Sequence, residues 1–244
     1  MGIGHCSRWR SELAGRHMIP DKSFQTTVVG SMPRPRHIKE MIEQLAVSGD
    51  STDGAAAEFQ WKMDRAVPYV VQMQEQAGVD ILSDGEWRRM SYIGVINELC
   101  SGFDLSLREV GGERQTWHIV TGEVIPRDPG VFAREARSLK QNTAREVKVA
   151  MPSPYLLGER MWDAALSRRA YPTKRDFTNA LVPILRQELL ALRDEGVAFA
   201  QIDDPELCLF VDPRVRAEYD DPDGEAAYCV ELLNRVVDGQ HVPA

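Results

Sequence analysis

Two stretches of the chain show the same order of hydrophobic and polar positions. Each begins with a long run whose apolar residues recur at helical spacing, passes through a glycine, continues as a short apolar run and ends in acidic residues. The first stretch covers residues 55–86 and turns at Gly78, and the second covers residues 173–205 and turns at Gly196. Glycine commonly closes a helix in the left-handed conformation, and Pro205 cannot continue a central strand. The pattern predicts two helix–strand units with acidic groups at the ends of their strands.

The remaining hydrophobic pattern continues this alternation of helices and strands, with one interruption. Residues 103–125 alternate around Gly111 and Gly112, which predicts a β-hairpin. Helical connections between strands force parallel pairing, so we expect an α/β fold. Four or five strands suffice for an open parallel sheet but not for a closed eight-stranded barrel. We predict strands at residues 26–30, 79–83, 146–151 and 197–202, and helices at residues 38–45, 55–77, 131–141, 155–167, 173–195 and 224–237.

Composition and charge narrow the class of protein. A formal net charge of −8 argues against a nucleic-acid partner. No apolar run approaches the roughly 20 residues of a membrane span, and the N-terminal residues lack the apolar segment of a secretory signal. The cysteines at positions 6, 100, 208 and 229 show no paired spacing, which indicates reduced thiols and a cytoplasmic protein.

The acids at the two strand ends are the first candidates for chemistry, because α/β folds bind ligands at the carboxyl ends of parallel strands. Asp84 and Glu86 lie two residues apart and share a face if strand geometry persists. Asp203 and Asp204 are adjacent, so they point to opposite faces. One interpretation places Glu86 and Asp203 on one rim, where they bind a cationic group such as a substrate ammonium. The alternative is that these acids cap helices or lie in solvated loops.

Two further sets of residues offer groups that bind anions. Gly30 and Ser31 follow a predicted strand, and their backbone N–H groups present a site for an anion; a simple turn is the alternative. Arg88 and Arg89 offer guanidinium groups for a carboxylate or phosphate, while ordinary surface arginines are the alternative.

Metal and nucleophilic chemistry have little support in the residues themselves. Cys208 and His118 have no partner at ligand spacing, so a buried thiol and a structural histidine are expected. The same lack of a histidine base or an activated nucleophile argues against a free-standing enzyme that uses carboxylate acid–base chemistry.

Four segments together resemble a known family. The segments TTVVGSMPRP, AGVDILSDGEWRR, AMPSP and AQIDDPEL occur in this order, and the combination resembles the catalytic barrel of the cobalamin-independent methionine synthases across roughly residues 25–240. The resemblance implies a (β/α)₈ TIM-type barrel that transfers a methyl group from a methylated folate to the thiol of homocysteine through a bound zinc. We therefore expect residues 1–24 to form a polar arm, and residues 25–244 to form an incomplete TIM-type barrel with a hairpin excursion around residues 103–125.

The resemblance also assigns roles to the candidate residues. Ser31, next to Gly30, would meet the carboxylate of the amino acid, and Glu86 and Asp203 would hold its ammonium. Asp204 stands where the family usually has a glutamate. The expected site consists of Glu86 and Asp203 as catalytic residues, with Gly30, Ser31, Asp84, Glu86, Arg88 and Asp203 as substrate-binding residues.

The zinc ligands of the family belong to a later part of its barrel: an H-x-C segment, a glutamate and a cysteine. The sequence stops before these segments, so we expect this chain alone to bind no zinc and a companion chain to supply the ligands. Zinc holds the substrate thiol as a thiolate, whereas a free thiol with a pKa of about 8.5 is mostly protonated near neutral pH. An unfinished barrel also exposes strand edges that a partner would cover.

The hypothesis is therefore one subunit of a split thiol methyl- or alkyltransferase, with methylated folate as a candidate donor. Two alternatives stay open. One is a catalytically inactive, truncated paralogue that binds an amino acid or folate or acts as a partner subunit. The other is a homodimer that closes the barrel with a second copy.

Overall fold

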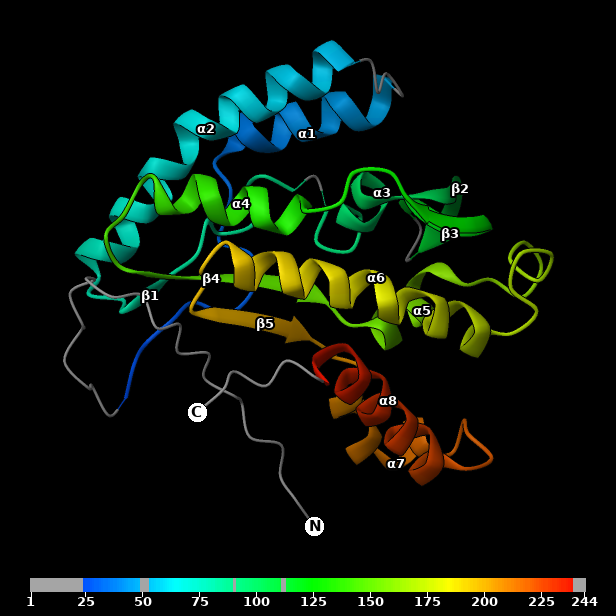
Figure 1. Ribbon diagram of the computed structural model, residues 1–244. Coiled ribbons are helices and arrows are strands. Elements are labelled where there is room, and N and C mark those ends of the chain that lie inside the picture. Colours follow the sequence, from blue (N-terminus) through cyan, green and yellow to red (C-terminus); the bar gives the residue numbers. More distant parts are fainter. Residues whose placement is uncertain (1–23, 49–52, 90, 111–112, 239–244) are drawn as a thin grey trace.

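A parallel sheet forms the centre of the molecule (Figure 1). The computed structural model describes residues 24–48, 53–89, 91–110 and 113–238. The sheet has the order β1 (Ile81–Leu82), β4 (Glu146–Pro152) and β5 (Phe199–Asp203), with β4 parallel to both neighbours. Thr27 adds an isolated parallel bridge to Ile81. These four segments therefore stand side by side in the order of the chain.

Helices connect the strands and lie largely on one side of the sheet, where α4 and α6 run beside each other (Figure 1). None of the described helices combines the length and the apolar character needed to cross a membrane. The helices are α1 (Arg36–Ser48), α2 (Asp53–Gln76), α3 (Val95–Leu99), α4 (Val131–Lys140), α5 (Pro154–Met161), α6 (Lys174–Asp194), the 3₁₀ helix η1 (Leu207–Val211), α7 (Pro213–Arg216) and α8 (Pro222–Val237).

The main core lies between the sheet and these helices. In β4, Val147, Val149 and Met151 are buried in this core, and strand geometry sends the intervening Lys148 and Ala150 to the opposite face. This opposite face, which we call the inner face, is where the polar side chains of the sheet gather.

Long antiparallel strands interrupt the helix–strand order. Strand β2 (Cys100–Val110) pairs with β3 (Glu113–Pro126), and the register shifts between Ser101 and Phe103. The intervening Gly102 has φ +102°, and a Cβ there would meet the carbonyl oxygen of Glu123 at 2.5 Å. A glycine is therefore needed where the two backbones approach. The pair falls in the region whose alternation predicted a hairpin.

Local signals explain where the principal helices end. Gly78 and Gly196 follow α2 and α6 with φ of +78° and +71°, as the left-handed helix end predicts. At the start of α6, Thr173 accepts a hydrogen bond from the Asp176 amide and the Asp176 carboxylate accepts one from Thr173 N at 2.9 Å, which forms a capping box.

Three predicted elements are markedly shorter than expected. The strand predicted at 79–83 is reduced to Ile81–Leu82. The strand predicted at 26–30 contributes only the bridge at Thr27. The helix predicted at 155–167 ends at Met161, since Asp163 Oδ1 accepts the Ala165 amide at 2.8 Å and Ser167 Oγ accepts the Asp163 amide at 2.9 Å. Such side-chain bonds to the local backbone compete with helical hydrogen bonds.

Candidate functional site

The turn after β1 places the first acid of the site. Gly85 and Glu86 have φ of +67° and +60°, so the chain turns sharply, and Asp84 Oδ1 accepts the Glu86 amide at 2.8 Å. Strand geometry does not persist here, and the prediction that Asp84 and Glu86 share a strand face is wrong. A non-glycine residue in the left-handed region costs roughly 1–2 kcal/mol, so the surrounding structure must hold Glu86 in place.

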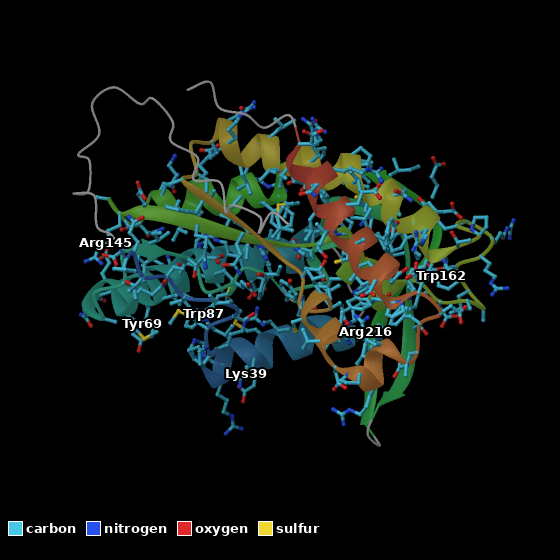
Figure 2. The ribbon with its side chains drawn as sticks, turned by 90° about the horizontal axis from the view of Figure 1, so that it is seen from below. Lys39, Tyr69, Trp87, Arg145, Trp162 and Arg216 are labelled. Carbon is cyan, nitrogen blue, oxygen red and sulfur yellow. The ribbon has the colours of Figure 1, made fainter. Side chains whose placement is uncertain are left out.

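Trp87 provides much of that support. Its buried indole packs in a second core with Ile38, Phe59 and Met63, and Nε1 donates to the carbonyl oxygen of Met32 at 3.2 Å. Trp87 is labelled in Figure 2. The turn is thereby fixed against the loop that carries Ser31.

The two loops meet at the carboxylate of Glu86. Ser31 Oγ donates to Glu86 Oε2, and the Met32 amide donates to the carbonyl oxygen of Gly85 at 3.1 Å. Arg34 Nη2 donates to the main-chain oxygens of Glu86 and Arg89, at 2.6 Å each. Glu86 is buried, with 5% of its surface exposed, and its carboxylate receives a hydrogen bond from a neutral hydroxyl.

Asp203 reaches the same region from the end of β5. The register pairs Lys148 with Phe199 and Ala150 with Gln201, so Gln201 and Asp203 share the inner face with Lys148. Gln201 Nε2 donates to Asp203 Oδ1. This carboxylate is therefore also held by a neutral donor.

Lys148 and Tyr92 lie within electrostatic reach of both acids. Burial lowers the pKa of Lys148, and the carboxylates of Asp203 and Glu86 oppose that shift. Burial also raises the pKa of Tyr92, and the same two carboxylates raise it further. The structure thus brings Ser31, Glu86 and Asp203 together.

Asp204 points elsewhere, as adjacent strand positions predict. It accepts hydrogen bonds from Ser153 Oγ at 2.7 Å and from Cys229 Sγ at 3.0 Å. Ser153 also caps α5 by accepting the Leu156 amide at 2.9 Å. Burial raises the pKa of the Cys229 thiol, and Asp204 raises it further. Asp204 therefore joins β5 to α5 and α8.

Arg88 and Arg89 are buried, so the interpretation as surface arginines is wrong. Arg88 Nη2 donates to Asp64 and to Ser138 on the outer helices. Arg89 makes a bidentate pair with Glu135 at 2.6 and 2.9 Å. Burial alone would lower the pKa of Arg89, but the carboxylates of Glu135, Asp84 and Glu86 together outweigh it and the pKa is raised. Because Arg88 bonds to α2 and α4, we leave it out of the proposed site.

Sequence reasoning missed Lys148, Tyr92 and Arg34. The available signal was a single polar residue within an apolar strand, as at Lys148 and Gln201. Next to Ser31 lies a pocket of about 400 Å³, with Lys39 (labelled in Figure 2) on its wall. It is lined by Ser31, Met32, Pro33, Arg34, Lys39 and Ile42.

The described residues do not form a metal centre. No group of three or more His, Cys, Asp or Glu side chains in the described ranges is placed to hold a metal ion. Zinc implied by the resemblance therefore does not fit the residues in view, and we derive no step through it. Cys208 is exposed, contrary to the expected buried thiol, while Cys100 and Cys229 are buried.

Comparisons with known proteins identify the family of the chain. Residues 24–237 match the family model described as "Cobalamin-independent synthase, Catalytic domain". The chain is 29% identical over 220 residues to a methionine synthase from Thermococcus kodakarensis, with 89% of this chain and 59% of the relative covered. It is 28% identical over 182 residues to one from Sulfolobus acidocaldarius, covering 74% and 51%.

Solved structures show a similar fold. The B12-independent methionine synthase from Shewanella sp. W3-18-1, in complex with selenomethionine, superposes with a TM-score of 0.63 at 23% identity, covering 88% of this chain and 58% of that one. A putative vitamin-B12-independent methionine synthase from Listeria monocytogenes also gives 0.63, at 22% identity, covering 91% and 62%. The chain thus spans between about half and three fifths of the length of these proteins.

Proposed function

The chain belongs to the cobalamin-independent synthase catalytic-domain family, and from that premise we propose that it forms the amino-acid-binding part of an enzyme that transfers a methyl or alkyl group to a thiol. The substrate in this proposal is a homocysteine-like amino acid. Glu86 and Asp203 hold its ammonium, and Gly30 and Ser31 receive its carboxylate.

The observation that carries the proposal is how the two acids are held. Ser31 and Gln201, both neutral, donate to Glu86 and Asp203, so neither donor cancels a carboxylate charge. Both acids also act on the same two groups, Lys148 and Tyr92. Two carboxylates in a partly desolvated site attract a cation more strongly than they would in water. A substrate ammonium provides the cation and the hydrogen-bond donors.

The other end of the substrate meets the loop after Thr27. Gly30 has φ +78°, and no atom lies within 4 Å of the position that a Cβ would occupy there, so its backbone is accessible. Consecutive backbone N–H groups in such a turn bind anions. Because Ser31 Oγ already donates to Glu86, the main chain is the part that we assign to the carboxylate.

We further propose that a group outside the described residues activates the substrate thiol. When bound, zinc would hold the substrate sulfur as a thiolate. Within the described part of the chain β5 pairs with β4 alone, and all five residues of β5 remain partly exposed. We propose that a companion polypeptide with an H-x-C segment, a glutamate and a cysteine completes the sheet and supplies the ligands; a homodimer is the alternative.

The charge of the pocket beside Ser31 suggests which molecule donates the methyl or alkyl group. The pocket beside Ser31 carries Arg34 and Lys39 on its wall, which favours an anionic molecule. A methylated folate, whose glutamate part is anionic, is the donor that this surface favours.

Calorimetric titration tests the amino-acid site. L-Methionine should bind the protein more tightly than 4-(methylthio)butanoate, which lacks the amine. Asp203→Asn, which keeps the shape and an acceptor oxygen, should weaken L-methionine binding about 10- to 100-fold, while the surface control Asp194→Asn should not. Equal binding of the two compounds by the wild-type protein would contradict the assignment.

Co-expression with neighbouring reading frames tests the partner. A complex that contains zinc by elemental analysis and methylates homocysteine supports the split enzyme. A dimer of this chain supports the homodimer. Amino-acid binding without turnover in every complex supports an inactive paralogue.

A further inference from the structure

Lys148 is a cation in an unusual position. It lies in the middle of β4 with 6% of its surface exposed, between Val147 and Val149, which pack into the core. A buried ammonium is destabilising unless hydrogen bonds and opposite charges compensate it. Its partners therefore indicate why the position is a lysine.

The partners of Lys148 lie on both sides of β4. Its Nζ donates to the carbonyl oxygen of Val28 at 2.5 Å and to Gln201 Oε1 at 2.7 Å. An ammonium only donates hydrogen bonds, so Gln201 must turn its oxygen toward Lys148. The Gln201 amide nitrogen then faces Asp203 Oδ1 and donates to it. Lys148 thus fixes the orientation of the group that holds Asp203.

The bond to Val28 reaches the other end of the site. Val28 is two residues before Gly30, and this segment joins the sheet through a single bridge at Thr27. One side chain of β4 therefore contacts the segment that leads to Ser31 and, through Gln201, the acid on β5. Glu86 and Asp203 face the same ammonium and oppose the burial-induced lowering of its pKa.

We propose that Lys148 is a positioning residue that sets the spacing between Asp203 and the Gly30–Ser31 loop, by binding Gln201 on one side and the Val28 carbonyl on the other. It acts through these two groups and does not touch the substrate. The expected effect of Lys148 on substrate binding rests on the proposed amino-acid site. The expected effect on the segment around Val28 does not depend on that proposal.

Two variants test the two contacts of Lys148 separately. Lys148→Met keeps the length of the side chain but donates no hydrogen bond. Gln201→Leu removes the bonds to Lys148 and to Asp203 and leaves the bond from Lys148 to Val28. Lys62→Met, on the exposed surface of α2, is the matched control. Each protein is examined by hydrogen exchange with mass spectrometry and by titration with L-methionine and 4-(methylthio)butanoate.

The expected results differ between the variants. In Lys148→Met, exchange in the peptide covering residues 26–32 should become faster, and L-methionine should bind about 10- to 100-fold more weakly. The amine-free compound should lose less affinity, because it depends only on the Gly30–Ser31 loop, whereas L-methionine depends on both that loop and Asp203. Gln201→Leu should weaken L-methionine binding without faster exchange at residues 26–32.

Three results would overturn the inference. Unchanged exchange at residues 26–32 in Lys148→Met would contradict the claim that Lys148 holds the segment around Val28. Unchanged L-methionine binding in Gln201→Leu would contradict the claim that Gln201 positions Asp203. Equal loss of both compounds in Lys148→Met would show that Lys148 acts on the Gly30–Ser31 loop alone and does not position Asp203. If the wild-type protein binds neither compound, the proposed function fails, while the exchange result still decides the structural link.

Discussion

Two charged clusters meet at the segment Glu86–Arg89, and they are built differently. In the outer cluster, Arg88 pairs with Asp64 and Arg89 pairs with Glu135, so each cation has its own carboxylate. In the inner cluster, Glu86 and Asp203 receive hydrogen bonds from neutral groups and share the field of Lys148. Paired charges hold helices to the sheet, whereas carboxylates without a direct ion-pair partner retain the capacity to bind a cation.

The turn at Gly85 and Glu86 separates the clusters. Its two left-handed residues send Glu86 to the inner face, and the chain then carries Arg89 to the carbonyl oxygen of Ala150 at 2.6 Å and to Glu135. Neighbours in sequence therefore serve different purposes, one in ligand binding and the other in stability.

The largest effect is expected in the outer cluster. Arg89→Met leaves the buried Glu135 carboxylate without its partner and should lower the free energy of unfolding by about 3–5 kcal/mol. Urea denaturation measures this loss. Arg193→Met, whose partner Asp194 is exposed, serves as the control and should cost less than about 1 kcal/mol. Similar losses for the two variants would remove the distinction between buried and exposed pairs.

A smaller effect is expected at the turn. Gly85→Ala forces a side chain into the left-handed region, where its Cβ meets Met32 Cβ at 3.0 Å and Val70 Cγ1 at 3.1 Å. Gly78→Ala has the same backbone strain with nothing within 4 Å. The crowding should make Gly85→Ala less stable than Gly78→Ala by about 1–3 kcal/mol in thermal or urea unfolding. Equal stabilities would mean that the turn is loosely packed.

The smallest effect is expected at His118, which belongs to neither cluster. Burial lowers the pKa of His118 below its ordinary value of 6.5. Well above pH 6.5 both the folded and the unfolded states are neutral at this residue, so it does not make stability depend on pH. As the pH falls below 6.5, the unfolded state binds the proton first and stability decreases until the folded-state pKa is reached. His118→Gln should reduce this decrease in a series of urea titrations; a variant that makes it steeper would contradict the sign.

The ends of the two long helices and the acid at the end of β5 could be predicted from the sequence, because they depend on residues that are close together in the chain. Gly78 and Gly196 end their helices by adopting positive φ, and Asp203 closes a parallel strand. The family resemblance assigned Ser31, Glu86 and Asp203 to one substrate, an assignment that stays a prediction, and in the structure Ser31 contacts Glu86.

The remaining features depend on tertiary contacts that sequence periodicity does not contain. The turn at Glu86 breaks the alternation from which a shared face for Asp84 was predicted. Arg88 is buried, and its partners Asp64 and Ser138 lie on helices distant from it in the sequence. Lys148 is a lone polar residue in an apolar strand, and only the register with β5 places Gln201 beside it.

A thermodynamic cycle tests the central claim most directly. The difference in binding free energy between L-methionine and 4-(methylthio)butanoate is measured by calorimetry in the wild-type protein and in Glu86→Gln. If Glu86 binds the ammonium, the advantage of the amine should fall by about 1.5–3 kcal/mol in the variant. An advantage that is the same in both proteins would contradict the assignment of the inner cluster to ammonium binding.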